Sequence, residues 1–360
     1  LARPKAPAFV RLGSWIGADR DGNPYVTADV TRSAAEIAAV HVLLGYEKVA
    51  ARLARTMTHD DALAPPSSEL VALLGEHARV LGPERTAQIA QRSHGESYRR
   101  ALLAIEARIV DTRRGAAGRY RDAAELAAEL EVIQESLLAA GAPRAAFSDL
   151  QHLVWQVSTF GFHLAELEVR QHSQVHAETL AAIEAAGGRT DDLDERSAEV
   201  LEVFRVMAEL QDRFGPDACR RYIVSFTTSA ADLAAVYALA RHALGEAADS
   251  LALDVIPLFE TFADLRASVD VLEAVIAEPA VQRRLAQTGR RLEVMLGYSD
   301  SSKDVGPASA ILALYEAQRR IAEWAQSHGL TLTLFHGRGG ALGRGGGPVS
   351  YTHLTLPTNA

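Results

Sequence analysis

The sequence predicts an α/β protein built as an incomplete (β/α)8 barrel with large all-helical insertions, and it predicts a chain that is predominantly α-helical overall. Short apolar runs typical of buried strands recur along the chain, and helical stretches separate them. Strands that alternate with helices indicate a parallel sheet or barrel. About six strand candidates are visible, where a closed barrel of this class has eight. Polar residues follow most of the runs at their C-terminal ends.

The first strand candidate, Ala8–Ala18, ends at a turn rich in Asp-Gly and Asn-Pro. Capping-box pairs directly follow two later strand candidates: Ser229 with Asp232, and Thr261 with Asp264. They predict that helices start there. The later strand candidates are Phe160–Arg170, Tyr222–Phe226, Leu251–Phe259, Leu292–Gly297 and Leu330–Phe335.

Between the first two strands lie Ala-, Leu-, Glu- and Arg-rich stretches whose apolar residues recur every three or four positions, as in amphipathic helices. The expected helices cover 28–56, 69–81, 97–114 and 123–140. We therefore divide the chain into the first strand with its loop, a helical insertion, consecutive β/α units and a tail. These segments are 1–27, 28–158, 159–348 and 349–360.

The two ends of the chain differ from the rest. The chain has no initiator Met and opens on a loop-like LARPKAP, so we expect an internal fragment. The last twelve residues read VSYTHLTLPTNA. We interpret them as a non-native tail, with true divergence as the alternative.

Composition excludes several classes of function. The 360 residues are 48% hydrophobic and 23% charged, a globular balance. The net charge of −9 gives no general basic surface for nucleic acid. Apolar runs stay short of the ~18–20 residues of a membrane span. Cys219 is the sole cysteine, which excludes an intramolecular disulfide and fits a cytoplasmic protein.

Chemistry is expected at the strand ends, because the C-terminal face of a barrel is its catalytic face. Glu260 and Asp300 follow two neighbouring strand candidates. Magnesium takes oxygen ligands, typically one or two carboxylates with substrate oxygens and water. The alternative is that each carboxylate caps a helix or pairs with an arginine. From the residues alone, the two interpretations have equal weight.

Three arginines and a histidine form a second group of candidates. Arg170 ends one strand, while His336, Arg338 and Arg344 lie among the glycines that follow the last strand. Arginine forks suit a ligand that carries phosphate and carboxylate, and a titratable histidine can donate a proton. The alternative for Arg170 is a salt bridge with a neighbouring glutamate, and a lone histidine is usually structural.

The remaining polar candidates are expected to support the site. Asp19, Arg20 and Asp21 can form a buried network that braces the C-terminal mouth of the barrel. We prefer this structural role to a direct role in catalysis. Trp15 is of a type more often found in a core than in a ligand wall, and Lys303 either pairs with its neighbour Asp304 or supports the metal site. His172 and His176 have helical spacing, but no third ligand is evident nearby, so zinc is not expected.

Several separated motifs together resemble the phosphoenolpyruvate carboxylase family, and they occur in the family's order. They are GSWIGADRDGNP at 13–24, LEVRQHS at 167–173, PLFET at 257–261, LGYSDSSKDVG at 296–306 and FHGRGGALGRGGGP at 335–348. Ala18 replaces the second of two family glycines, and His172 stands where the family often has glutamate.

The resemblance implies a (β/α)8 barrel enzyme that joins phosphoenolpyruvate and bicarbonate into oxaloacetate and phosphate with Mg2+ or Mn2+. It implies that Glu260 and Asp300 are metal ligands, that Arg170 holds substrate phosphate and that Arg338 lies at the phosphate or carbon dioxide position. Arg344 would lie on a mobile loop. A homotetramer is expected of the full-length protein.

The family's principal catalytic histidine and its downstream arginines have no counterpart in these residues, so we expect the chain alone to be inactive. Two alternatives stay open. One is another metal-dependent barrel enzyme that acts on phosphoenolpyruvate or a 2-oxo acid without bicarbonate. The other is a fragment that binds substrate or a partner without turnover.

Overall fold

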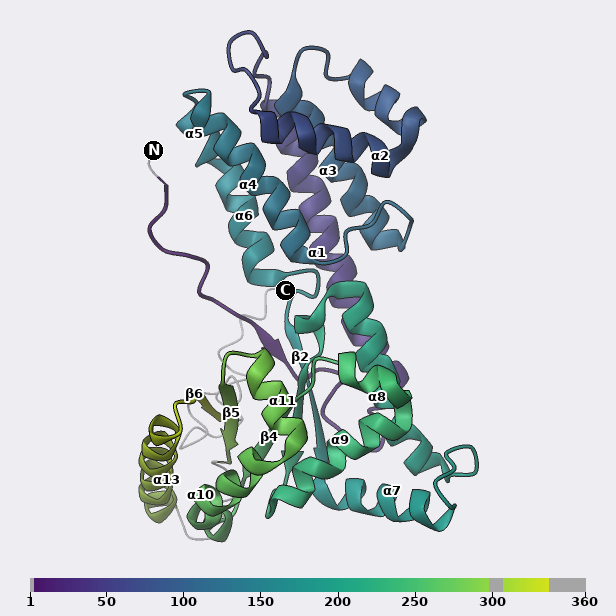
Figure 1. Ribbon diagram of the computed structural model, residues 1–360, viewed down its shortest axis with the longest axis vertical. Helices are drawn as coiled ribbons and strands as arrows, with labels where there is room; N and C mark the ends of the chain where they lie inside the picture. Colours follow the sequence, from purple (N-terminus) through teal and green to yellow (C-terminus); the bar gives the residue numbers. More distant parts are fainter. Residues whose placement is uncertain (1–2, 298–306, 337–360) are drawn as a thin grey trace, which may run out of the picture. The chain divides into compact units, whose positions relative to one another are not determined.

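The computed structural model describes residues 3–297 and 307–336 (Figure 1). Within these residues, six parallel strands follow one another in chain order. The strands are β1 (Gly13–Ser14), β2 (Glu166–His172), β3 (Arg221–Ser225), β4 (Asp254–Phe259), β5 (Arg291–Leu296) and β6 (Thr331–His336). The predicted fold class, an incomplete (β/α)8 barrel with helical insertions, is confirmed.

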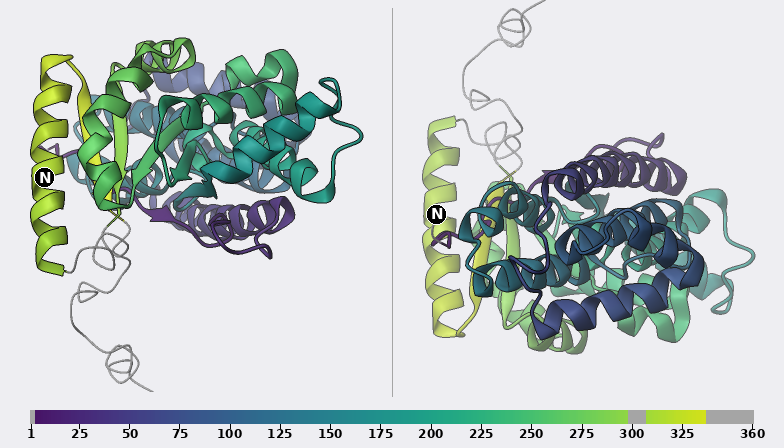
Figure 2. Two further views of the ribbon diagram at one scale, coloured as in Figure 1. Left: turned by 90° about the horizontal axis from the view of Figure 1, so that it is seen from below. Right: turned by 90° about the horizontal axis from the view of Figure 1, so that it is seen from above.

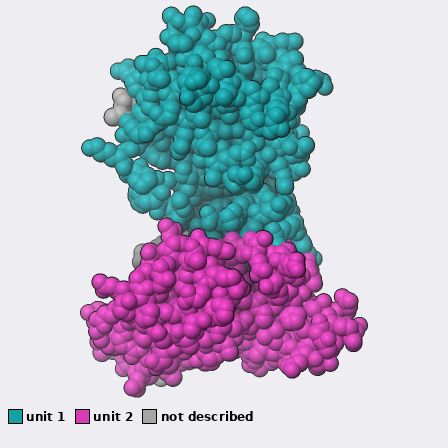
Figure 3. Space-filling view, viewed as in Figure 1, with its two compact units in different colours: residues 1–17, 28–167, 206–220 teal, residues 18–27, 168–205, 221–360 magenta. Residues whose placement is uncertain are grey.

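The chain divides into two compact units, which Figure 3 shows in different colours. The first comprises 1–17, 28–167 and 206–220, and the second comprises 18–27, 168–205 and 221–360. Strand β2 and helix α8 (Glu195–Phe214) each contribute residues to both units. The four segments expected from the sequence remain a prediction.

The first unit is mainly a helical bundle. Helix α1 packs against α3 and α6, and α2 packs against α3 and α4. Its helices are α1 (Ala28–Thr56), α2 (Ser68–Gln91), α3 (Ser97–Arg114), α4 (Ala123–Ala139), α5 (Pro143–Ala146) and α6 (Asp149–Phe160), with the 3-10 turn η1 (Pro216–Ala218).

In the second unit, helices alternate with β2–β6. Helix α13 packs against α10 and lies alongside β6 (Figure 2). Both predicted capping boxes are present, at the starts of α9 and α10. The helices are α7 (Ser173–Ala185), α9 (Ala230–Leu244), α10 (Phe262–Ala277), α11 (Pro279–Gln287) and α13 (Pro307–Ser327), with the 3-10 turn η2 (Gly245–Ser250).

Three predicted elements differ from the structure by more than three residues at one end or both. The first strand shrinks to Gly13–Ser14, because a turn that contains Gly17 at φ +79° interrupts the pairing with β2, which resumes at the bridge between Asp19 and Arg170. The second strand starts later, at Glu166, because α6 continues to Phe160 and positive φ at Gly161 and Leu164 forms a turn between them. Helix α2 extends beyond the predicted end across a kink at Gly82.

Along each parallel strand, successive side chains point to opposite faces of the sheet. Val169, Tyr222 and Val224 are buried. The alternate residues include charged groups, and Arg221 pairs in register with both Glu168 and Asp254. Arg221 donates from Nε to Oε2 of Glu293 at 2.6 Å and from Nη2 to Oε1 at 3.0 Å, which ties β3 to β5.

A buried polar network holds the first unit together. Arg108 ion-pairs with Glu129 and, at 2.6 Å, with Glu125, and its guanidinium lies over the ring of Tyr120. Oε2 of Glu129 accepts the Tyr120 hydroxyl at 2.6 Å and lies 2.9 Å from Nε2 of His77. The side chains of Arg108 and Glu129 are only 3% and 8% exposed. In this environment a carboxylate depends strongly on its cation.

Among the described residues, no helix combines the length and the apolar character needed to cross a bilayer.

Arg108→Met is expected to destabilise the helical unit by about 3–5 kcal/mol, because it leaves a buried carboxylate without its cation. The measurement is urea unfolding followed by far-ultraviolet circular dichroism. Arg79→Met is the matched control, since Arg79 pairs with Glu76 on the exposed surface of α2. Equal urea midpoints for the two variants would contradict this account of the network.

Candidate active site

Arg170 is held by a forked ion pair at the end of β2. Its Nε and Nη2 donate to Oδ1 and Oδ2 of Asp19, each at 2.8 Å, and Nη1 lies 3.9 Å from Oδ2 of Asp21. Burial lowers the pKa of the guanidinium, but the hydrogen bonds and charges of Asp19, Asp21 and Glu260 outweigh burial and raise it. Arg170 therefore remains a fixed cation, with Asp19 as its bidentate partner.

Backbone hydrogen bonds extend this connection. Arg170 N donates to Ala18 O at 3.0 Å, and Arg20 N donates to Arg170 O at 2.9 Å. Arg20 is 7% exposed, and its Nη1 donates to Ala18 O at 3.1 Å. Asp21 N donates to Oδ1 of Asp19 at 3.2 Å. These contacts connect the turn that holds Asp19, Arg20 and Asp21 to β2, and the bracing role of the three residues stays a prediction.

Glu260 directly follows β4 and is 4% exposed. Its Oε2 accepts the backbone N–H of Phe226, at the end of β3, at 2.9 Å. A buried carboxylate at a strand end suits a hard divalent cation. Among the described residues, no group of three or more His, Cys, Asp or Glu side chains could hold a metal. A cation here would therefore need ligands beyond these residues.

Several predicted site residues lie outside the described residues: Asp300, Lys303, Arg338 and Arg344. His336 is the last residue of β6, and its side chain is likewise outside them. Trp15 is half-buried in the loop that follows β1, within the first unit. The structure thus brings together Asp19, Asp21 and Arg170 at one strand end, with Glu260 close enough for its charge to act on Arg170.

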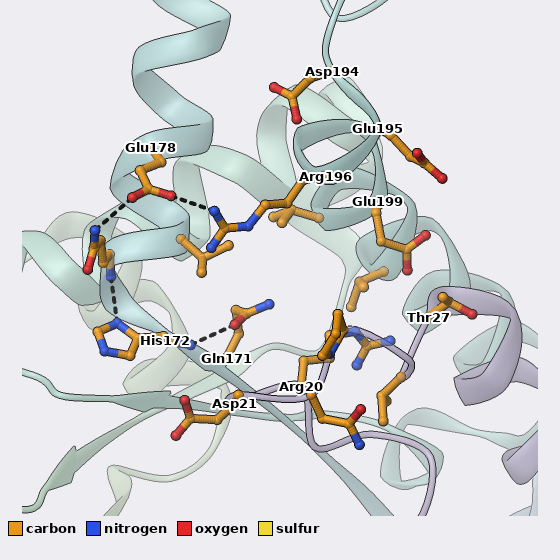
Figure 4. Close-up of a pocket in the computed structure, with 18 of the residues that line it drawn as sticks. Arg20, Asp21, Thr27, Gln171, His172, Glu178, Asp194, Glu195, Arg196 and Glu199 are labelled. Atoms are coloured by element: carbon orange, nitrogen blue, oxygen red, sulfur yellow. Dashed lines mark hydrogen bonds and ion pairs between the residues drawn. The ribbon is translucent and has the colours of Figure 1, made fainter.

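A cleft of about 960 Å3 opens beside this network in the second unit (Figure 4). Arg20, Asp21 and His172 line it, and Tyr222 contributes to its wall. Glu178 accepts hydrogen bonds from Nε2 of Gln174 at 2.7 Å and from Nη1 of Arg196 at 2.9 Å, and Figure 4 shows Glu178 facing Arg196. The start of α8 adds further carboxylates, from Asp194, Glu195 and Glu199.

This acidic lining disfavours an anionic ligand, because like charges repel in a cleft of low dielectric. Arg170 and Glu260 are not among the residues that line the cleft. We therefore place the candidate site at the strand ends that carry Arg170 and Glu260, and we treat the cleft as its neighbour.

The comparisons with known proteins decide the family. The model of the phosphoenolpyruvate carboxylase family matches residues 2–195 and 186–360, which together cover nearly the whole chain. The chain belongs to the phosphoenolpyruvate carboxylase family. The match includes each of the motifs on which the sequence resemblance rests.

Relatives named phosphoenolpyruvate carboxylase come from several organisms. The protein from Xanthomonas oryzae pv. oryzae is 37% identical over 96% of this chain and 41% of its own length. The Roseiflexus castenholzii protein is 36% identical over 98% of the chain and 42% of its own length. The Nocardia farcinica protein is 35% identical over the whole chain and 43% of its own length. The chain thus spans about two fifths of the length of these curated relatives.

Sequence reasoning missed two residues at the site. Phe226 has φ +53°, unusual for a residue other than glycine, and it supplies the N–H that binds Glu260. Gly297 lies against Glu260 so closely that an added Cβ would be 2.9 Å from the Glu260 Cα. The only available signals were a large residue directly after a strand and a glycine before the Tyr-Ser-Asp sequence, and neither points to Glu260.

His176, on α7, packs against Tyr222 of β3. Its Nε2 lies 2.9 Å from the Tyr222 hydroxyl, and it is fully buried. Burial lowers its pKa from 6.5 to about 4. Since the unfolded chain binds a proton near pH 6.5 and the folded chain does so only near pH 4, acid favours unfolding between these values.

His176→Gln is expected to reduce the acid sensitivity of the fold. The parent should lose up to about 3 kcal/mol through this group as the pH falls from 6.5 to 4, and the variant should not. The measurement is the urea midpoint at several pH values in that range. His242→Gln, at an exposed position of α9, is the control. An identical pH slope in parent and His176→Gln would contradict the prediction.

Proposed function

We propose that the chain is the central part of an enzyme that joins phosphoenolpyruvate and bicarbonate to give oxaloacetate and phosphate. The observation that carries the proposal is the fixed Arg170 beside the buried carboxylate of Glu260, in a chain of this family. One group suits a phosphorylated acid and the other suits a divalent cation.

Arg170 would act through its fixed geometry. Its Nε and Nη2 donate to Asp19, which holds the guanidinium in one orientation for a substrate phosphate. A guanidinium that is already oriented stabilises negative charge on the phosphoryl oxygens without reorganising during the reaction. Arg338 and His336 are proposed as further catalytic residues, with Arg344 and Trp15 proposed to bind substrate.

The reaction can be written in balanced steps. A bicarbonate oxygen attacks phosphorus and the bond to the enol oxygen breaks, which gives carboxyphosphate and the enolate of pyruvate. Carboxyphosphate releases carbon dioxide and phosphate, and C3 of the enolate attacks the carbon dioxide. Positive charge from arginines at the mouth compensates the negative charge that moves between these species.

A divalent cation, Mg2+ or Mn2+, is part of the proposal. Glu260 is its proposed ligand from the described residues, and Asp300 is the second. The cation would act as a Lewis acid on substrate oxygens. Lys303, Asp19, Arg20 and Asp21 are proposed to support the site. A cytoplasmic location and a homotetramer complete the proposal for the whole protein.

The reaction class is tested by oxaloacetate formation from phosphoenolpyruvate in the whole protein that contains this chain, with and without bicarbonate. The proposal expects turnover that depends on bicarbonate. Turnover without bicarbonate would favour another metal-dependent barrel enzyme, and binding without turnover would favour a non-catalytic protein.

Arg170→Lys in the chain is expected to weaken phosphoenolpyruvate binding about tenfold or more in the presence of Mn2+, because a lysine loses the fork that Asp19 orients and hydrogen bonds to charged groups contribute ~1.5–3 kcal/mol. The measurement is isothermal titration calorimetry. Arg196→Lys is the control, since Arg196 is two-thirds exposed and pairs with Glu178. Unchanged affinity in Arg170→Lys would refute its proposed role.

A further inference from the structure

The environment of Glu260 is built by residues from two neighbouring strand ends. Phe226 follows β3, Glu260 follows β4 and Gly297 follows β5. Gly297 N donates to Phe259 O at 2.8 Å, which extends the pairing of β5 with β4 by one residue. The carboxylate therefore lies between a donor from one neighbouring strand and a backbone wall from the other.

The donor comes from a residue in an unfavourable conformation. Phe226 has φ +53°, in the left-handed region that residues with a side chain rarely adopt. In this conformation its N–H points to Oε2 of Glu260 at 2.9 Å. Strain of this kind persists only where the surroundings determine it, and it is common at functional sites.

Contacts on three sides hold the Phe226 turn. Its carbonyl oxygen accepts the Ser173 hydroxyl at 2.9 Å, and its ring stacks on His172 with centroids 4.6 Å apart. The next residue, Thr227, donates its N–H to Leu258 O at 3.3 Å. Phe226 as a whole remains 38% exposed, so burial does not account for its conformation.

The backbone of Gly297 lies against the other side of Glu260. An added Cβ at this position would lie 2.9 Å from the Glu260 Cα and 3.0 Å from its Cγ, closer than side chains normally approach. Positive φ is not the reason for this glycine, since Gly297 is absent from the positive-φ glycines of the described residues. The nearest atom belongs to the backbone, so it cannot move aside as the end of a flexible side chain could.

We propose that Phe226 and Gly297 are positioning residues that fix the Glu260 carboxylate for the divalent cation. Phe226 acts through its strained backbone N–H, and Gly297 acts because, without a Cβ, its backbone can lie against Cα, Cβ and Cγ of Glu260. This inference rests on the proposed function, because it presumes that Glu260 binds the cation. Groups that orient a metal ligand typically change metal affinity 10–100-fold when they are altered.

The experiment measures Mn2+ affinity of the 360-residue chain by electron paramagnetic resonance of free Mn2+. Gly297→Ala is expected to raise the dissociation constant about tenfold or more. Gly45→Ala is the matched control, because a Cβ there meets nothing within 4 Å. Circular dichroism melts establish that each variant is folded.

A pair of substitutions at Phe226 tests the backbone role apart from the ring. Isoleucine keeps an apolar side chain but resists positive φ, whereas glycine removes the side chain and adopts positive φ freely. We expect Phe226→Gly to bind Mn2+ about tenfold or more tightly than Phe226→Ile. The reverse order would assign the effect to the ring and overturn the inference, even if Gly297→Ala failed to fold.

Glu260→Gln separates failure of this inference from failure of the proposed function. If the parent chain binds no Mn2+, or if Glu260→Gln leaves the affinity unchanged, the metal assignment itself is wrong. If Glu260→Gln weakens binding but the Gly297 and Phe226 variants behave like the control, the assignment stands and the positioning role is refuted.

Discussion

The forked ion pair between Asp19 and Arg170 is the interaction on which the site depends. The two residues are 151 positions apart in the chain, and a helical segment lies between them in sequence. Closing so long a loop has an entropic cost that the local contacts must offset. Two charge-assisted bonds and the backbone bonds beside them provide that compensation. Arg170 is thus a residue of the site and also the residue that fixes the DRDG turn to β2.

The other charged residues of the parallel strands are also held in ion pairs. Barrel interiors are usually filled with branched apolar side chains, yet here Arg221 meets Glu293 between strands and Arg170 meets Asp19 at the strand end. Charges in such places are tolerated only when they are paired. Each pair also selects one strand register, because a slip of one residue would turn the charged side chains to the opposite face. The polar residues therefore specify the arrangement of strands as well as the chemistry of the mouth.

Sequence patterns predicted the parts of the fold that local rules govern. Helices α1 and α3 have the predicted bounds, and the capping boxes at Ser229 and Thr261 are present, since helical periodicity and capping depend on neighbouring residues. The short β1 was not predicted, because the apolar run of 8–18 carries no information about where pairing with β2 stops. Likewise, the sequence predicted that Glu260 directly follows a strand, as it does, but it did not predict that Asp19 pairs with Arg170, two residues before the end of β2. Asp19 lies far away in sequence, and only folding brings the two together.

Phe226 and Gly297 show why the finest features of the site escape sequence reasoning. Neither residue is of a type that suggests metal chemistry, and each matters through backbone atoms. Phe226 contacts His172 and Ser173, and its neighbour Thr227 bonds to Leu258. The need for glycine at 297 arises from the path of the chain at Glu260. A carboxylate at the end of one strand is therefore oriented by the two strands beside it. In a parallel barrel this is a general consequence of the architecture, because every strand end at the mouth has neighbours whose backbones approach within hydrogen-bonding distance.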